Sequence, residues 1–150
     1  LTLPSMPAHK VKLEIDQGAT FDKTFTWLTG TKTKAVPVDL TGCKARSHFR
    51  EDIGSDEVLI GLSTENGRIV LGGTAGTIHL FISAADTAAM NWQSAVYDLE
   101  IEFPNGTVIR RMTGSVVVSP EVTRGLVIDV GGRFVGDSLG LPFSGEVVDA

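Results

Sequence analysis

The sequence has little cysteine, few aromatic residues, an excess of acidic over basic residues and no long apolar run. Its single cysteine, Cys43, excludes an internal disulfide and any cysteine-rich metal site. No apolar run reaches the roughly 20 residues that span a bilayer, so no membrane partner is expected. Lysine and arginine number 13 against 18 aspartates and glutamates, for a net charge of −5. Because phosphate binding needs a basic surface, nucleic acid is not expected as a partner.

The composition that remains is typical of one globular domain. At 150 residues the chain is long enough to bury a hydrophobic core. Hydrophobic residues make up 42% and charged residues 21%, which is ordinary for a folded rather than a disordered chain. The 17 glycines suit a β protein with many turns.

The stretch 94–124 predicts a β-hairpin around which the chain is organised. Residues 97–103 alternate between apolar and acidic side chains, the period of a strand with one wet face. The apolar set is Tyr97, Leu99, Ile101 and Phe103, and the acidic set is Asp98, Glu100 and Glu102. Residues 104–106, Pro-Asn-Gly, supply a tight turn in which Gly106 is expected to have a positive φ.

The second strand of the hairpin runs from Thr107 to Val118, before Pro120. Arg110 and Arg111 are expected to face the acidic row across the hairpin. Strict alternation places Arg110 on the same side as Met112, however, so a β-bulge near Gly114 is expected.

The rest of the chain predicts an all-β fold, an antiparallel β-sandwich of seven to eight short strands with one short helix. The helix is expected over 83–90, with Ser83 as its N-cap. The strands that precede the hairpin are expected at 10–16, 20–29, 43–50, 58–62, 68–71 and 77–82.

We expect three parts: an extended N-terminal arm over 1–9, a β-sandwich domain over 10–124 and a glycine-rich apolar extension over 125–150. The extension holds six glycines and has four acidic residues against one arginine, a local charge of −3. A disordered tail does not normally carry so many large apolar groups, and we infer that this one lies on a neighbouring subunit. The candidate partner-contact residues are Leu126, Ile128, Phe134, Leu139 and Phe143.

No catalytic residue, metal ligand or cofactor is expected. The three histidines are scattered, and His48 lies on the basic outer face of its strand. Cys43 is interpreted as a small buried hydrophobe, and the acidic row as a wet face before a catalytic one. Trp27 and Trp92 are isolated tryptophans, for which a packing role is commoner than stacking on a sugar. The glycines at 72–76 lack the end of a phosphate-binding loop and predict a turn.

Several segments, in their order along residues 10–124, resemble a family of small phage-encoded β-sandwich virion proteins of the tail and baseplate type. These segments are GATF at 18–21, VDLTG at 38–42 with Lys44-Ala45-Arg46, ENGRIVLGGTAGTIHLFISAADTAAM at 65–90, YDLEI at 97–101 and SPEVTR at 119–124. The resemblance implies a noncatalytic structural protein of the virion, assembled in the host cytoplasm. Its expected partners are other virion proteins and copies of itself, with no small-molecule substrate.

Three alternatives stay open at this point. The first is a capsid decoration protein, and the second is a carbohydrate-binding module that uses Trp27 or Trp92. The third is a hydrolase that uses the acidic strand.

Overall fold

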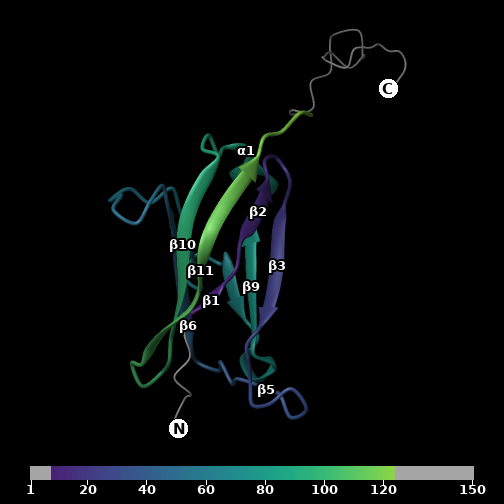
Figure 1. Ribbon diagram of the computed structural model, residues 1–150, viewed down its shortest axis with the longest axis vertical. Helices are drawn as coiled ribbons and strands as arrows, with labels where there is room; N and C mark the ends of the chain where they lie inside the picture. Colours follow the sequence, from purple (N-terminus) through teal and green to yellow (C-terminus); the bar gives the residue numbers. More distant parts are fainter. Residues whose placement is uncertain (1–7, 124–150) are drawn as a thin grey trace, which may run out of the picture. The chain divides into compact units, whose positions relative to one another are not determined.

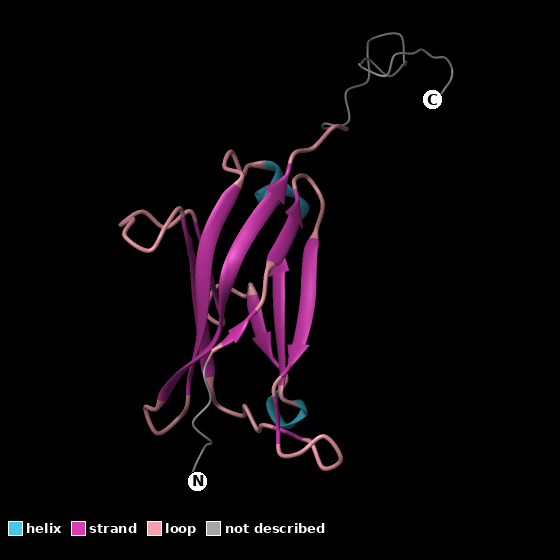
Figure 2. Ribbon diagram, in the orientation of Figure 1, coloured by secondary structure: helices cyan, strands magenta, loops and turns pink. Residues whose placement is uncertain are grey.

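The computed structural model describes residues 8–123, which form an all-β sandwich of two main sheets (Figures 1 and 2). The larger sheet has six strands in the order β1-β11-β10-β6-β7, with β2 also paired to β11. Its strands are β1 (His9–Lys10), β2 (Leu13–Asp16), β6 (Lys44–Arg50), β7 (Ile60–Ser63), β10 (Ser94–Glu102) and β11 (Val108–Ser119).

The smaller sheet has the order β3-β9-β8. Its strands are β3 (Phe21–Thr26), β8 (Ile69–Leu71) and β9 (Thr77–Ile82). A two-stranded ribbon of β4 (Leu28–Thr29) and β5 (Val36–Pro37) follows β3, a 3₁₀ turn η1 (Gly73–Ala75) joins β8 to β9, and one short helix α1 (Ala84–Ala88) precedes β10. Residues 8–123 thus hold eleven strands, and the eight that are longer than two residues match the expected number.

The hairpin predicted over 94–124 is present as β10 and β11 and lies in the middle of the larger sheet (Figure 1). The four apolar residues of the first strand are buried, and Leu99 and Ile101 have no exposed surface. At the turn Gly106 has a φ of 90°, and the Asn105 side-chain oxygen accepts the Thr107 N–H at 2.9 Å. The predicted alternation of residues 97–103, with its apolar side chains buried, and the predicted turn at 104–106 are therefore confirmed.

The β-bulge is also present, but it lies at Arg111 rather than near Gly114. Leu99 pairs with Met112 and Glu100 pairs with Arg110, so Arg111 is the extra residue on β11. A bulge places two successive residues opposite one residue of the partner strand. Arg111 therefore turns toward the inside of the sandwich, together with Met112, and the expectation that it faces the acidic row is wrong.

The N-terminal strand predicted over 10–16 is divided into β1 and β2, and both pair with β11 in parallel. The sandwich is therefore mixed at this edge instead of antiparallel throughout. Between the two strands, the Tyr97 hydroxyl donates to the Val11 carbonyl oxygen at 2.7 Å. The close approach needs glycine at 114, because a Cβ there would lie 2.3 Å from the same oxygen. His9, which we expected in the arm, belongs to β1.

The strand predicted over 20–29 also divides, because Trp27 leaves the smaller sheet between β3 and β4. Its backbone N–H donates to Gly76 and its carbonyl accepts from Val38, so it links two loops. The Trp27 side chain packs in the core, edge-to-face with Phe103 at a centroid distance of 6.0 Å.

Helix α1 has the predicted N-cap: the Ser83 hydroxyl accepts the Asp86 N–H at 3.1 Å. Inside the helix, Thr87 is fully buried and joins α1 to the turn between β2 and β3. Its hydroxyl donates to the Ala19 carbonyl at 2.8 Å and accepts the Gly18 N–H at 3.0 Å. A helix of under two turns is unstable alone, so this contact holds it in place.

Candidate interaction surfaces

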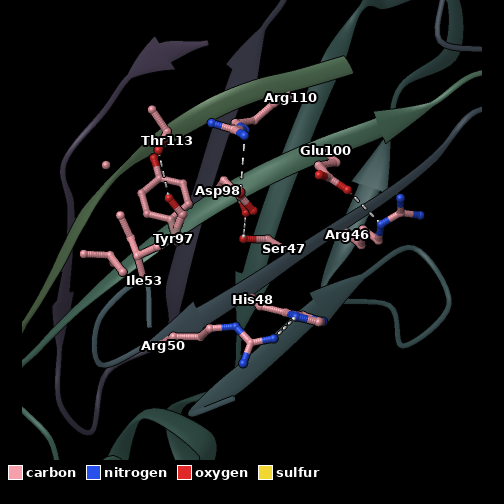
Figure 3. A pocket seen from close by; sticks show the side chains of 12 residues that line it. Arg46, Ser47, His48, Arg50, Ile53, Tyr97, Asp98, Glu100, Arg110 and Thr113 are labelled. Atoms are coloured by element: carbon pink, nitrogen blue, oxygen red, sulfur yellow. Dashed lines mark hydrogen bonds and ion pairs between the residues drawn. The ribbon is translucent and has the colours of Figure 1, made fainter. Parts of the chain in front are cut away.

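The outer face of the larger sheet carries alternating rows of opposite charge from β6, β10 and β11 (Figure 3). Arg46 on β6 donates from Nε to Glu100 Oε1 at 3.0 Å and from Nη1 to Glu102 Oε1 at 3.2 Å. On the other side of β10, Arg110 Nε lies 3.7 Å from Asp98 Oδ2. We call this set the charge ladder: Arg46, Asp98, Glu100, Glu102 and Arg110.

Each charged side chain of the charge ladder has an oppositely charged partner within the ladder. The hydrogen bonds to Glu102 and then Glu100 raise the pKa of Arg46 above its ordinary value. All five side chains are at least partly exposed, and ion pairs of this kind contribute roughly 0–1 kcal/mol each. The arrangement suits a surface that fixes strand register, because each carboxylate has a guanidinium neighbour on an adjacent strand.

A hollow of ≈ 460 Å³ extends the charge ladder toward the loop that follows β6. Arg50 holds this loop, donating from Nη1 to the carbonyls of Ser55 at 3.0 Å and Asp56 at 2.8 Å. Its second amino group donates to His48 Nδ1 at 3.2 Å, and His48 is exposed as expected. Ile53 stands at the loop with 92% of its surface exposed. Figure 3 shows these side chains around the hollow.

A second depression, which we call the edge groove, opens where the edges β1 and β3 of the two sheets approach each other. Its walls are mostly apolar, and it has a volume of ≈ 280 Å³. The lining residues are His9, Val11, Phe25, Thr26, Trp27, Leu28, Ile78, Arg111 and Met112.

Two residues that line the edge groove each have a buried side-chain nitrogen without a partner. Among the buried side-chain nitrogen and oxygen atoms of residues 8–123, Trp27 Nε1 and Arg111 Nη1 have no hydrogen-bond partner. Trp27 is only 4% exposed, and the Arg111 guanidinium carbon lies 5.2 Å from the centroid of its ring. Burial lowers the pKa of Arg111, although an arginine stays charged at neutral pH. An unsatisfied buried donor costs about 1–3 kcal/mol. Arg111 as a whole is partly exposed and lines the groove, so it brings a positive charge to it.

The other residues considered from the sequence are dispersed. Cys43 is half-buried, and burial, followed by the nearby Asp39 charge, raises the pKa of its thiol. A raised thiol pKa lowers the fraction of reactive thiolate at neutral pH. Trp92 packs partly against the core, and Trp27 cannot stack on a sugar because Phe103 and Arg111 cover its ring.

Within residues 8–123 no three histidine, cysteine or carboxylate side chains are grouped as metal ligands, and no helix is long and apolar enough to cross a membrane. The five candidate partner-contact residues, Leu126, Ile128, Phe134, Leu139 and Phe143, lie outside the described part of the chain.

Sequence reasoning missed the edge groove. The single signal for it was the broken alternation at Arg110 and Met112, which indicates that one arginine of the pair turns inward. No family model and no curated protein matches the chain.

Proposed function

We propose that this protein is a noncatalytic structural component of a tailed bacteriophage virion, a tail or baseplate protein. It joins neighbouring subunits through its sandwich and its terminal segments. The observation that carries the proposal is that the described segments resembling the phage family make structural connections within the sandwich. Two of them, 44–46 and 97–101, share one hollow, and there Arg46 is already paired with Glu100.

Each connection uses polar groups of its own segment. In the segment 38–42, Asp39 Oδ1 accepts the Thr41 N–H at 3.0 Å and its hydroxyl at 2.6 Å. These two hydrogen bonds lower the pKa of Asp39, so at neutral pH the carboxylate is a charged acceptor that fixes the turn before β6.

The segment 65–90 behaves in the same way. Asn66 Oδ1 accepts the backbone N–H groups of Ser63 and Arg68, each at 3.0 Å, and so closes the turn from β7 to β8. Arg68 Nη2 then reaches Asp86 Oδ2 on α1 at 2.8 Å. The segment 18–21 is tied to the same helix through Thr87. A scaffold whose turns are fixed in this way suits a part that carries load between neighbours.

The charge ladder supports a structural role over a hydrolytic one. A pair of catalytic carboxylates needs environments that separate the two pKa values. Here Glu100 and Glu102 share one guanidinium and are both partly exposed. The carbohydrate-binding alternative is left with Trp92 alone, because the ring of Trp27 is covered.

The experiment that tests the proposal is to locate and count the chain in purified particles. We expect quantitative mass spectrometry to find it in the virion, and averaged electron-microscopy images with a tagged copy to place it at the tail or baseplate. A baseplate part is present in small numbers, whereas a capsid decoration protein covers the shell lattice in many copies. Absence from particles, together with glycan binding or turnover of cell-wall polymer by the purified protein, would overturn the proposal.

A further inference from the structure

The edge groove has mostly apolar walls and one arginine, Arg111. The guanidinium of Arg111 can donate hydrogen bonds but cannot accept them. None of the described residues that line the groove is acidic, while His9 and Arg111 are basic or can become so. Its chemistry therefore selects a ligand that offers apolar side chains together with a carboxylate or carbonyl oxygen.

The groove also has the shape for an extended chain. Strand β3 ends the order β3-β9-β8 and β1 ends the order β1-β11-β10-β6-β7, so each is an edge strand. Edge strands leave backbone N–H and C=O groups that can pair with an added strand. Between them, Val11, Phe25 and Met112 give the apolar floor and walls. A peptide that lies along this edge would meet backbone partners at its sides and the positively charged Arg111 among the lining side chains.

We propose that the edge groove receives residues 125–150 of a neighbouring copy of this chain, bound as an extended segment. The inference rests on the proposed role of this segment in joining subunits, and it does not depend on where in a particle the subunits lie.

Charge and composition favour this occupant. The segment has four acidic residues and one arginine, which complements the basic groove, and its large apolar residues match the groove walls. Residues 126–130, Leu-Val-Ile-Asp-Val, place the Asp129 carboxylate inside an apolar run. That carboxylate can accept from Arg111, which is partly exposed and lines the groove. An extended segment of this length spans about 85 Å, which is sufficient to reach another copy.

The test is photo-cross-linking in the full chain. Leu28, at the rim of the groove and 45% exposed, is replaced by p-benzoylphenylalanine, and heavy-isotope-labelled and unlabelled copies are mixed before irradiation. We expect cross-links between position 28 of one copy and residues 125–150 of the other. The matched control carries the same group at Val70, which is 53% exposed on β8 of the smaller sheet, outside the groove, and should give no such cross-link.

The adjacent arginines supply the second control. Arg111→Gln should lower the yield of mixed-isotope cross-links by about tenfold, the loss expected when one charge-assisted hydrogen bond is removed. Arg110→Gln changes the same side chain one residue away, on the outer face, and should leave the yield unchanged. Thermal melts of both variants show whether the sandwich stays folded. If Arg111→Gln unfolds, Asp129→Asn makes the same test from the other side of the contact.

Three outcomes would overturn the inference: no cross-links from position 28 to residues 125–150, cross-links only within one copy, or equal yields for Arg111→Gln and Arg110→Gln. These failures are distinguishable from failure of the proposed function. A chain found in the virion without cross-links in the groove refutes the groove alone. A chain that cross-links in this way but is absent from particles refutes the virion role alone.

Discussion

The hydroxyl of Thr87 allows a direct test of how one buried hydrogen-bonding group stabilises this fold. It lies on α1, is fully buried, and connects the helix to the turn between β2 and β3. Two backbone groups depend on it: the Ala19 carbonyl accepts from the hydroxyl at 2.8 Å, and the Gly18 N–H donates to it at 3.0 Å. Replacement by valine keeps the volume and removes both of these hydrogen bonds, along with the one that the hydroxyl donates to the Ala84 carbonyl inside the helix at 3.1 Å.

Two substitutions at this position, one that removes the hydroxyl and one that removes the methyl group, separate hydrogen bonding from packing. Thr87→Val leaves two backbone groups without their side-chain partner, at about 1–1.5 kcal/mol each, so the free energy of unfolding should fall by about 2–3 kcal/mol. Thr87→Ser keeps the hydroxyl and loses one methyl group, which costs about 1 kcal/mol. For a slope of about 2 kcal/mol/M, the urea midpoint should fall by about 1–1.5 M for valine and about 0.5 M for serine.

The assay is equilibrium urea unfolding of the full chain, followed by circular dichroism, with the slope compared between variants. An unchanged slope shows that the midpoint reports stability rather than a change in the unfolded state. The reasoning is refuted if serine lowers the midpoint more than valine does. In that case the methyl group, and not the hydroxyl, would hold the helix against the turn.

Four further predictions concern other parts of the molecule. Leu99→Ala, at a fully buried position, should cost about 2–5 kcal/mol in urea unfolding, and an unchanged midpoint would mean that the faces of β10 are reversed. Gly114→Ala should lower the melting temperature more than Gly67→Ala, because only at 114 would the new Cβ meet backbone, and equal effects would contradict the close approach. Burial raises the pKa of Tyr97, the one tyrosine, to about 12. Its ultraviolet absorbance should therefore change well above pH 10, and the free energy of unfolding should decline as the pH rises from 10 toward 12. A change in absorbance centred near pH 10 would contradict this. A chain cut after Arg124 should melt like the full chain but fail to enter particles, and a collapsed melt or full incorporation would each contradict the joining role of 125–150.

Local rules were sufficient to predict the hairpin, the helix cap and the class of the fold. Each depends on residues that are neighbours in the sequence: the alternation of 97–103, the Asn105-Gly106 turn, and Ser83 three residues before Asp86. The corresponding contacts are within one hairpin or one helical turn. The neighbouring residues in the sequence are therefore sufficient to predict these features.

The pairing of β1 and β2 with β11 could not be predicted in the same way. Both strands run parallel to β11, which is about 100 residues later in the chain. The partner is chosen by the fit of Tyr97 and Gly114 around Val11, and the spacing of apolar residues in 10–16 contains no information about it. The edge groove was missed for the same reason, because its residues come from β1, β3, β4, β9 and β11.

The bulge at Arg111 links the two surfaces that the structure presents. Alternation that buries Met112, Val116 and Val118 would, if continued without interruption, also bury Arg110 and expose Ile109. The extra residue reverses the alternation, so that Ile109 packs against the core and Arg110 reaches Asp98 on the outer face. Arg111, the extra residue of the bulge, therefore lies inside. There its guanidinium group is close to the Trp27 ring and brings a positive charge to an otherwise apolar groove. One irregular position in β11 thus completes the charge ladder and supplies the edge groove with the donor on which its proposed ligand depends.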